Sequence, residues 1–417
     1  MARKRIVITG LGVASCFGSD PNVFYENLLN GVSGVKKIDT FPCEHLSTQI
    51  AAPVGNLSPE RYIDKKRLRR IDPFLAHALV AGKSALEFAG FPNADVEGVV
   101  DRSRCGVLIG SGLGGLTTYT LGVTSCQSHE NKRVSPFFIP YTLTNMAGAM
   151  LGIDLGWTGP NYSISTACAT ATYAIIEAAH WIHRGAADMM LCGGVEAAVT
   201  EVGIAGFAAC KALSQRNDDP AGASRPWTRS RDGFVMGEGA GVLVLEELEH
   251  ALRRGATIYA EYLGGGVSCD AHHITELKED GSGLIMCMEN ALRDAGVSVS
   301  EIDHVNAHAT STPQGDIVEL RALHKLFPDP TQVTANATKS MIGHALGGAG
   351  GLEAVATVMA CHKGEIHRTL NFENDPEPEI TLHIPTKRYK REIRKALKNS
   401  FGFGGHNASL VLGAWNE

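Results

Sequence analysis

The sequence lacks long hydrophobic runs, and it has no excess of positive charge. No stretch reaches the roughly 18 consecutive apolar residues that indicate a membrane span, so we expect no membrane association. Lys and Arg number 38 against 44 Asp and Glu, which gives a formal net charge of −6. A general nucleic-acid-binding protein is expected to be basic, so no nucleic-acid partner is predicted. Any basic binding surface must be local.

The ten cysteines include no C-x-x-C pair, and the opening MARKRIVITG passes almost at once into a predicted strand, without a secretory leader. We therefore expect reduced thiols in a cytoplasmic protein, or in a protein of the plastid stroma if a plant-type leader has been removed. Metal binding is not predicted. Neither His304 with His308 nor the adjacent His272 and His273 has a convincing set of companion ligands.

Glycine is abundant, at 47 of 417 residues, and 44% of the chain is apolar, which is typical of a globular protein with a large core and close backbone contacts. Two Gly-rich stretches resemble phosphate-binding loops, but each lacks part of the motif. Gly10-Leu11-Gly12 follows a predicted strand, yet Ser15 stands where a dinucleotide fingerprint has its third glycine, which favours a tight turn. The stretch at 347–351 lacks the G-K-[ST] ending of a P-loop. No cofactor is therefore predicted.

Cys168 stands where a predicted strand meets a predicted helix. Small and β-favouring residues at 163–166 precede it, and apolar residues follow at helical spacing: Tyr173, Ile176, Ala179 and Ile182. A thiol at a helix N-terminus faces unpaired backbone N–H groups and the positive end of the helix dipole, which favour thiolate and can receive an oxyanion. The alternative is a small buried cysteine, but the flanking alanines leave the sulfur uncrowded. Cys168 is therefore predicted to be a nucleophile.

The second half of the chain echoes the first. Ile258 to Gly266 is similar to the strand at the start, and Thr338 to Cys361 repeats a short polar lead into an apolar helix, as around Cys168. We place the boundary near Gly255, between an N-terminal half at 1–255 with the nucleophile and a C-terminal half at 256–417. Two similar α/β halves would face each other, with the starts of the equivalent helices meeting in one site.

The densest basic cluster of this acidic chain lies in RYIDKKRLRR at 61–70, and it includes Lys65, Lys66, Arg69 and Arg70. It leads into a predicted helix. Such a charge run is often only a solvated helix face. It could instead dock an acidic partner, because opposite charge steers encounter and fixes orientation.

Two further segments are interpreted by their place in the fold. Residues 134–151 are strongly apolar, which fits ordinary core, the wall of a long apolar cavity or a subunit interface. Ser214 to Arg231 is polar and carries two prolines, so it is predicted to be a long surface loop.

Three motifs in the second half carry reactive side chains: NAHATSTPQGD at 306–316, KSMIGHALGGAGGLE at 339–353 and NSFGFGGHN at 399–407. Taken alone, each allows a structural role, such as a histidine hydrogen-bonded in the core. Together with STACATA around Cys168, they resemble in order and spacing the β-ketoacyl-acyl carrier protein synthases of types I and II, the Cys–His–His condensing enzymes of the thiolase superfamily. The resemblance covers essentially the whole chain, and several segments look especially like the type II enzymes of bacteria and plastids.

The resemblance implies a thiolase-like α/β fold with five αβαβα layers, normally a homodimer, and no cofactor. It also implies decarboxylative Claisen condensation of an acyl-enzyme with malonyl-acyl carrier protein, giving 3-oxoacyl-acyl carrier protein in fatty-acid elongation. His344 stands where the type III initiating enzymes carry asparagine. A thiolase would use a second cysteine near its C-terminus, which SFGFGGHN lacks. A free-standing polyketide ketosynthase and a non-catalytic partner subunit are the competing functions.

The same resemblance implies the roles of individual residues. Cys168 receives the acyl chain, the backbone N–H groups of Cys168 and Phe403 bind its oxyanion, and His308 and His344 donate hydrogen bonds to the malonyl thioester. Phe403 also gates the site. Lys339 pairs with Glu353 and keeps the imidazoles neutral. The substrate-binding and supporting residues are Leu113, Phe207, Thr310, Thr312, Phe401 and Asp316.

Because acyl carrier proteins are strongly acidic, the resemblance also favours docking of the carrier at Lys65, Lys66, Arg69 and Arg70. The departures from the family pattern are modest. Ala309 stands where bacterial relatives often have glycine, and His406 stands where many have threonine, and both variants resemble the plastid enzymes.

Overall fold

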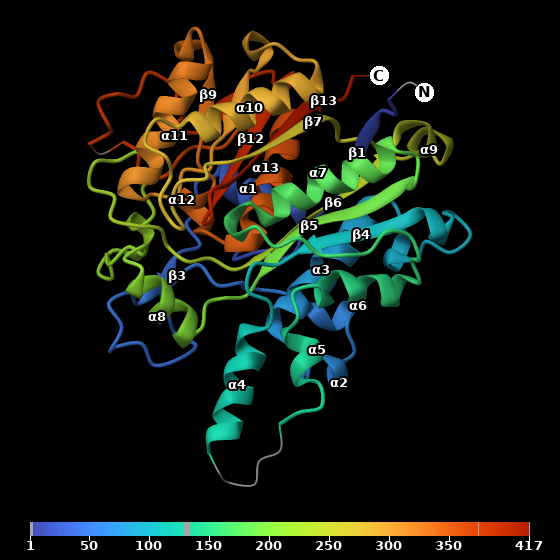
Figure 1. The fold of residues 1–417 in the computed structure, drawn as a ribbon. Coiled ribbons are helices and arrows are strands. Elements are labelled where there is room, and N and C mark those ends of the chain that lie inside the picture. The colour runs from blue at the N-terminus through green and yellow to red at the C-terminus, as the bar shows by residue number, and fades with distance from the viewer. Residues whose placement is uncertain (1–2, 129–133, 374, 417) are drawn as a thin grey trace.

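The computed structural model describes residues 3–128, 134–373 and 375–416, and nine of its strands form one sheet in the order β4-β5-β6-β1-β7-β13-β12-β8-β9 (Figure 1). The N-terminal half supplies β1 (Ile6–Ala14), β4 (Cys105–Gly110), β5 (Met189–Glu196) and β6 (Gly239–Glu247). The C-terminal half supplies β7 (Ala260–Cys269), β8 (His304–Asn306), β9 (Thr334–Asn336), β12 (Lys395–Gly402) and β13 (His406–Ala414). Two short pairs lie outside this sheet: β2 (Lys36–Lys37) with β3 (Ile50–Ala51), and β10 (Glu365–Ile366) with β11 (Tyr389–Lys390).

The strand pairing repeats between the two halves. In the first half β4 runs parallel to β5, β5 antiparallel to β6, and β6 antiparallel to β1. In the second half β8 runs parallel to β12, β12 antiparallel to β13, and β13 antiparallel to β7. The two series meet where β1 pairs with β7. The repeat confirms the expectation of two similar halves, while the boundary near Gly255 stays a prediction.

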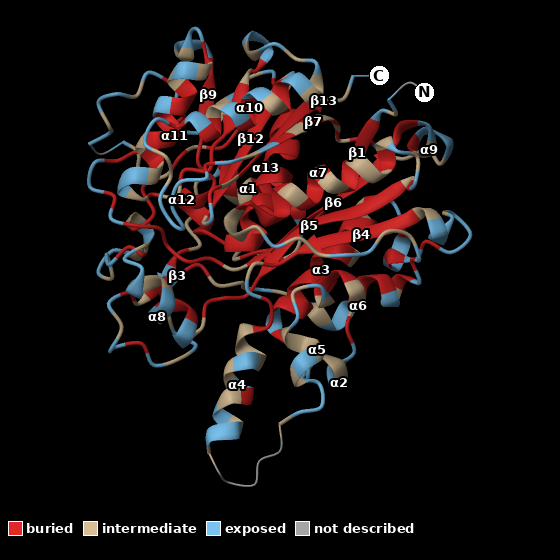
Figure 2. Ribbon diagram, in the orientation of Figure 1, coloured by how far each residue is buried: buried red, intermediate tan, exposed pale blue. Residues whose placement is uncertain are grey.

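Helices form three layers around the two halves of the sheet. On the outside, α3 (Pro73–Phe88) and α6 (Met146–Leu155) cover the first half, and α10 (Ser282–Ala295), with α11 (Pro313–Leu326) beside it, covers the second. Between them lie α7 (Thr170–His183) and α13 (Ala349–Lys363), which pack on strands of both halves (Figure 2). Every residue of α13 from Ala349 to Cys361 is buried, as expected for a helix enclosed on all sides. The predicted αβαβα layering is confirmed.

The other helices surround these layers, and local sequence determines where several of them begin. Asp20 and Asp64 each accept hydrogen bonds from two backbone N–H groups in the first turn of the helix that follows, and Asp72 accepts one. Within the described ranges, no helix combines the length and the apolar character needed to cross a bilayer. The helices that surround the layers are α1 (Pro21–Leu29), α2 (Lys65–Leu68), α4 (Leu116–Gln127), α5 (Phe138–Thr142), α8 (Glu201–Ala209), α9 (Leu248–Arg253) and α12 (Lys339–Ile342).

The predicted tight turn at Gly10-Leu11-Gly12 is wrong, because β1 continues through these residues to Ala14. The glycines serve close packing instead. A Cβ atom at Gly12 would lie 1.9 Å from the carbonyl oxygen of Ala81, and one at Gly10 would lie 2.3 Å from that of Ala85. Both oxygens belong to α3, so the glycines allow this helix to pack directly on the strand backbone.

The prediction of a surface loop from Ser214 to Arg231 is right for residues 215–222, which are exposed or half-buried, and wrong for most of the rest. Residues 223–228 are buried, and Trp227 has no exposed surface. The backbone N–H of Trp227 donates to Asp316 Oδ2 at 2.9 Å, and the buried guanidinium of Arg231 lies 3.6 Å from the same oxygen. The buried part of this loop is therefore held by internal hydrogen bonds and ion pairs, and Asp316 anchors it.

The apolar segment at 134–151 divides between core and surface. Its C-terminal part, in α6, is largely buried against α3 and β4. Its N-terminal part, around α5, contacts α4, and these two helices project from the layered body (Figure 1). The following apolar side chains of the two helices and the adjoining residues are exposed: Tyr119, Leu121, Phe137, Ile139 and Leu143. This part fits the predicted subunit interface better than ordinary core.

Candidate active site

Cys168 lies in a 3₁₀ turn at Ala167–Ala169 that leads directly into α7. The strand expected at 163–166 is wrong, because these residues are assigned to no strand. The turn is tight: Ala167 has a left-handed φ of 49°, and the N–H of Thr166 donates to Thr170 Oγ1 at 2.8 Å. The thiol therefore stands at the start of the helix, as the sequence predicts.

The second half repeats this arrangement. A 3₁₀ turn at Leu346–Gly348 leads into α13, and Leu346 also has a left-handed φ, of 47°. The two turns contact each other. β12 approaches from a further side, since a Cβ atom at Gly402 would lie 3.0 Å from the backbone nitrogen of Cys168. Two helix starts and the C-terminal motif thus converge at the thiol, which the echo between the halves predicts.

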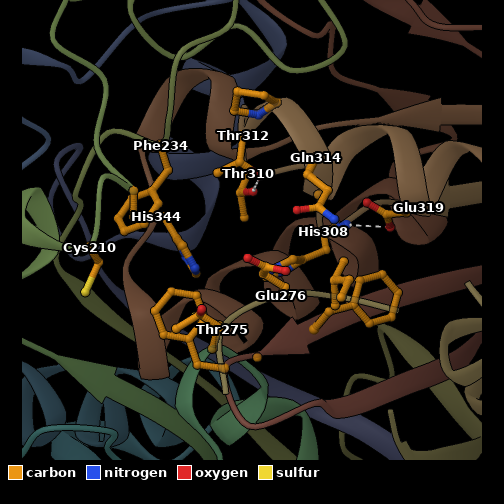
Figure 3. A pocket seen from close by; sticks show the side chains of 18 of the residues that line it. Cys210, Phe234, Thr275, Glu276, His308, Thr310, Thr312, Gln314, Glu319 and His344 are labelled. Atoms are coloured by element: carbon orange, nitrogen blue, oxygen red, sulfur yellow. Dashed lines mark hydrogen bonds between the residues drawn. The ribbon is translucent and has the colours of Figure 1, made fainter. Parts of the chain in front are cut away.

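Two imidazoles from the second half line the same cavity as Cys168, with His344 reaching in from one side and His308 from the other (Figure 3). Their ring centroids lie 5.4 Å apart, and the ring planes are nearly perpendicular at 85°. Neither ring nitrogen of His344 has a hydrogen-bond partner among the described residues, although both are buried. Because buried polar atoms are normally hydrogen-bonded, these nitrogens indicate a place for substrate atoms.

Lys339 determines the tautomer of His308. Its buried ammonium is paired with Glu353 Oε1, and it donates to the carbonyl oxygen of His308 at 2.7 Å and to Nδ1 at 3.3 Å. An ammonium only donates, so Nδ1 accepts and the ring proton is on Nε2. Burial, and next the charge of Lys339, hold the pKa of both His308 and His344 well below the usual value. Both are neutral donors at neutral pH, which is the state that the sequence predicts.

The Cys168 thiol does not have the lowered pKa that its position at a helix start predicts. Burial raises the pKa of Cys168 to about 12, and the charge of Lys339 and the N–H of Phe403 offset only part of this effect. The thiol is therefore protonated at neutral pH. Cys168 is half-buried at the cavity wall. The sequence shows the helix start but not how closely the surrounding protein excludes water from the sulfur, and this exclusion has the larger effect.

The raised pKa of Cys168 predicts slow, strongly pH-dependent alkylation. Only the thiolate reacts with iodoacetamide, and its fraction rises about tenfold per pH unit below the pKa. We expect the rate of modification at Cys168, followed by peptide mass spectrometry, to increase throughout the alkaline range. The exposed Cys126 serves as the internal reference. A rate at Cys168 that levels off near neutral pH would show that the resting sulfur is a thiolate.

The cavity has a volume of about 510 Å³ and brings together most of the predicted side chains. Phe401 packs against His308 with ring centroids 5.6 Å apart, and the ring centroid of Phe403 lies 6.4 Å from that of Phe207. Leu113 is not part of this wall; it lies after β4, where its N–H donates to Glu196 at 3.1 Å. Lys339, Glu353 and Asp316 are also outside the lining and are buried. The predicted residues that line the cavity are Cys168, Phe207, His308, Thr310, Thr312, His344, Phe401 and Phe403.

Several buried charged residues near the site were not identified from the sequence, among them Glu319 and Lys398. Glu319 accepts the backbone N–H groups of His308 at 2.9 Å and Ala309 at 2.8 Å, which holds the NAHATST loop. Lys398 on β12 places its Nζ 3.2 Å from Glu353 Oε2. A signal exists for both, because each is a charged residue at a position that the neighbouring pattern marks as buried, and charged residues are rarely buried without a partner.

The histidines considered as metal ligands have other surroundings. His304 is buried, with Nδ1 3.0 Å from the carbonyl oxygen of Thr334, while His272 and His273 are exposed. Across the described parts of the chain, no three His, Cys, Asp or Glu side chains converge as a metal site requires.

The predicted docking cluster lies on and beside α2. Lys65, Lys66, Arg69 and Arg70 are exposed, whereas the half-buried Arg67 binds Asp154 at 2.7 Å. Arg67 therefore has a structural partner, and the four exposed side chains present their charges to solvent.

Comparison with known proteins gives matches over nearly the full length. The beta-ketoacyl synthase N-terminal domain matches residues 3–251, and the beta-ketoacyl synthase C-terminal domain matches residues 259–373. The 3-oxoacyl-[acyl-carrier-protein] synthase I, chloroplastic, of Arabidopsis thaliana is 52% identical over 99% of this chain and 87% of its own length. The synthase II, chloroplastic, of the same plant is 50% identical over 98% of this chain and 76% of its own length. A chain in a solved complex of a type II polyketide synthase acyl-carrier protein with its ketosynthase superposes with a TM-score of 0.90 at 32% identity, over 99% of this chain and 100% of that one.

Proposed function

The chain belongs to the beta-ketoacyl synthase family, and on that premise we propose how its cavity performs the 3-oxoacyl-acyl carrier protein synthase reaction. The enzyme elongates fatty acids by condensing an acyl group with malonyl-acyl carrier protein, which loses carbon dioxide. The observation that carries the proposal is the convergence of Cys168, His308 and His344 on one cavity. Relatives named synthase I and synthase II match at 52% and 50% identity, so identity does not separate these subclasses.

In the first half-reaction, the Cys168 sulfur attacks the carbonyl carbon of the acyl thioester. A new S–C bond forms, the S–C bond to the carrier breaks, and the carrier leaves as a thiol. His344 accepts the proton of Cys168 and passes it to the leaving sulfur, because its ring nitrogens are neutral and have no other described partner. The N–H groups of Cys168 and Phe403 bind the oxyanion, and the effect of the Phe403 N–H, which lowers the pKa of the Cys168 thiol, supports this role.

In the second half-reaction, the malonyl group loses carbon dioxide. The electron pair of the broken C–C bond moves onto the thioester oxygen, and His308 donates to that oxygen through Nε2–H, with His344 as the second donor. Lys339 keeps the His308 proton on Nε2. The carbanion then attacks the acyl carbonyl carbon, a C–C bond forms and the S–C bond to Cys168 breaks. The leaving thiolate takes up a proton from the solvent, because the original proton of Cys168 left with the first carrier.

Aromatic side chains line the path to the thiol. Phe403 lies between Gly402 and Gly404, and Gly404 has a left-handed φ of 88°, so the loop has the conformational freedom that a gate requires. Phe207 faces Phe403 across the cavity. We propose that Phe403 moves to admit the acyl chain, and that Leu113 contributes to the acyl tunnel.

We propose that two copies associate through α4 and α5. Their exposed aromatic and aliphatic side chains form an apolar surface of the kind that subunit interfaces bury. The free state of all ten cysteines fits a reducing compartment, which we propose is the cytoplasm or the plastid stroma.

Incubation of the purified protein with acyl- and malonyl-acyl carrier protein tests the function. We expect carbon dioxide and 3-oxoacyl-acyl carrier protein in equal amounts, and an acyl adduct on Cys168 by mass spectrometry. Condensation of acyl-CoA without release of carbon dioxide would favour a thiolase. Absence of the adduct would favour a non-catalytic subunit.

We propose that the acidic carrier docks on the exposed basic residues beside α2, and charge reversal tests this. Lys66→Glu with Arg69→Glu should raise the apparent KM for carrier-bound substrates about tenfold or more, because like charges repel the carrier. Loading of Cys168 from a small acyl thioester should be unchanged. Steady-state kinetics with both donors measure the difference.

The matched control is Lys387→Glu with Arg253→Glu, which makes the same charge change at two exposed positions away from α2. It should leave both KM values within about twofold. An equal loss with carrier-bound and small thioesters in the Lys66 and Arg69 variant would assign the cluster a structural role instead.

A further inference from the structure

Lys398 is a fully buried lysine that the mechanism above does not use. It lies on β12, and its side chain has no exposed surface. Its ammonium donates to Thr172 Oγ1 on α7 at 2.9 Å and to Ser400 Oγ on its own strand. Burying an ammonium costs free energy unless the charge is paired and hydrogen-bonded. The Lys398 ammonium therefore depends on the groups that surround it.

The partner of Lys398 is Glu353, which Lys339 also binds. Lys339 Nζ contacts Oε1, and Lys398 Nζ lies 3.2 Å from Oε2. The carboxylate on α13 therefore has a lysine ammonium beside each oxygen. Lys339 donates a hydrogen bond to Oε1, whereas Lys398 stands beside Oε2 at ion-pair distance and directs its hydrogen bonds to Thr172 and Ser400. The neighbouring helix surface leaves space for this contact, because a Cβ atom at Gly350 would lie 3.1 Å from Lys398 Nζ.

The two lysines have different second partners. Lys339 also donates to His308, to its carbonyl oxygen at 2.7 Å and to Nδ1 at 3.3 Å. Lys398 instead donates to Thr172 and Ser400, which do not line the cavity. The hydroxyl oxygens of these two residues are 2.8 Å apart, and both residues are fully buried. Lys398 is therefore linked to His308 through Glu353 and Lys339 in turn.

We propose that Lys398 is a positioning residue for decarboxylation: by holding Oε2 of Glu353, it fixes the carboxylate so that Oε1 keeps Lys339 on His308. The inference rests on the proposed function and assigns a residue to it. Without Lys398, one oxygen of Glu353 is buried with no cation, and the carboxylate is free to turn. Lys339 then no longer holds the His308 tautomer with its proton on Nε2.

The charges around Lys398 make this arrangement sensitive to pH. Burial lowers the pKa of Lys398 to about 8, although Glu353 opposes the shift. The other charged groups facing it are Lys339 from α12, which adds to the lowering, and Glu319 from α11, whose own pKa burial raises to about 7. A base with a lowered pKa loses its proton as the pH rises past that value, so Glu353 loses one of its two cations above about pH 8.

Lys398→Met tests the proposal, because methionine keeps most of the volume and removes the charge. We expect kcat for malonyl-acyl carrier protein decarboxylation to fall about 10- to 100-fold, with KM within about twofold and acyl transfer to Cys168 within about threefold. In a Glu353→Gln background the same substitution should change kcat by less than about twofold, because it acts through that carboxylate. Lys395→Met on the same strand, where Lys395 pairs with Glu301 at the surface, is the control and should change none of these values.

The pH profile gives a second measurement. The wild-type decarboxylation rate should decline as pH rises through about 8, and Glu319→Gln should retain this alkaline limb. If Lys398→Met does not fold, Lys398→Ala is assayed with added ethylammonium, which should restore at least part of the lost rate. Full kcat in Lys398→Met, multiplicative effects with Glu353→Gln, or a wild-type profile without the alkaline limb would overturn the proposal. If the wild-type protein releases no carbon dioxide from malonyl-acyl carrier protein, the proposed function fails instead.

Discussion

Replacing Cys168 with alanine should reduce condensation about 10⁴-fold or more, while malonyl-acyl carrier protein is still decarboxylated. The sulfur is the atom that forms the acyl bond, and alanine cannot replace it. The decarboxylating groups do not depend on it: His308 is held by Lys339 and by Glu319, and both contacts remain. When both products are measured in the same reaction, this variant should therefore release carbon dioxide without forming the 3-oxoacyl product.

Cys126→Ser is the control for this experiment, because Cys126 is an exposed thiol on α4, outside the cavity. It should retain the acyl adduct and the condensation rate of the wild-type protein. An adduct on a different cysteine in Cys168→Ala, or condensation within about tenfold of the wild-type rate, would contradict the assignment of the nucleophile.

The sequence predicts the elements of this fold better than their contacts. The strand at the start of the chain and the helices after Cys168 and His344 follow from apolar periodicity. The role of Gly12 does not, because the partner that requires a glycine is the carbonyl oxygen of Ala81, about 70 residues away in the chain. In the same way, Trp227 lies in a polar segment, and its burial depends on distant residues: its backbone N–H binds Asp316, and its side chain joins a core cluster with residues of α10 and α11.

Prediction from the sequence has the same limit at the candidate site. The motifs identify the reactive side chains of the cavity, because the reaction restricts their types, but not the rest of its lining, such as Phe234, Thr275 and Glu276. They do not show the pKa of Cys168, which depends on how closely the surrounding protein excludes water from the sulfur, nor the second cation on Glu353, which Lys398 supplies from another element. Both are properties of packing between distant segments, and local patterns do not encode them.

Replacing His308 with alanine should reduce decarboxylation about 10²- to 10³-fold, because one donor to the developing enolate oxygen is lost. Acyl transfer to Cys168 should stay within about tenfold of the wild-type rate. The backbone carbonyl that binds Lys339 remains, and so does the pair between Lys339 and Glu353. Carbon dioxide release and the rate of adduct formation on Cys168 measure the two steps separately.

The comparison with His344→Ala makes this result specific. His344 has unpaired ring nitrogens in the cavity and is proposed to serve both half-reactions, so its loss should slow both acyl transfer and decarboxylation. The exposed His383, which lies outside the cavity lining, provides the control variant His383→Ala. Equal losses of acyl transfer in the His308 and His344 variants would show that the two imidazoles share the proton of Cys168. Loss of acyl transfer in the His308 variant alone would assign the base to His308, and the division of roles proposed here would then be reversed.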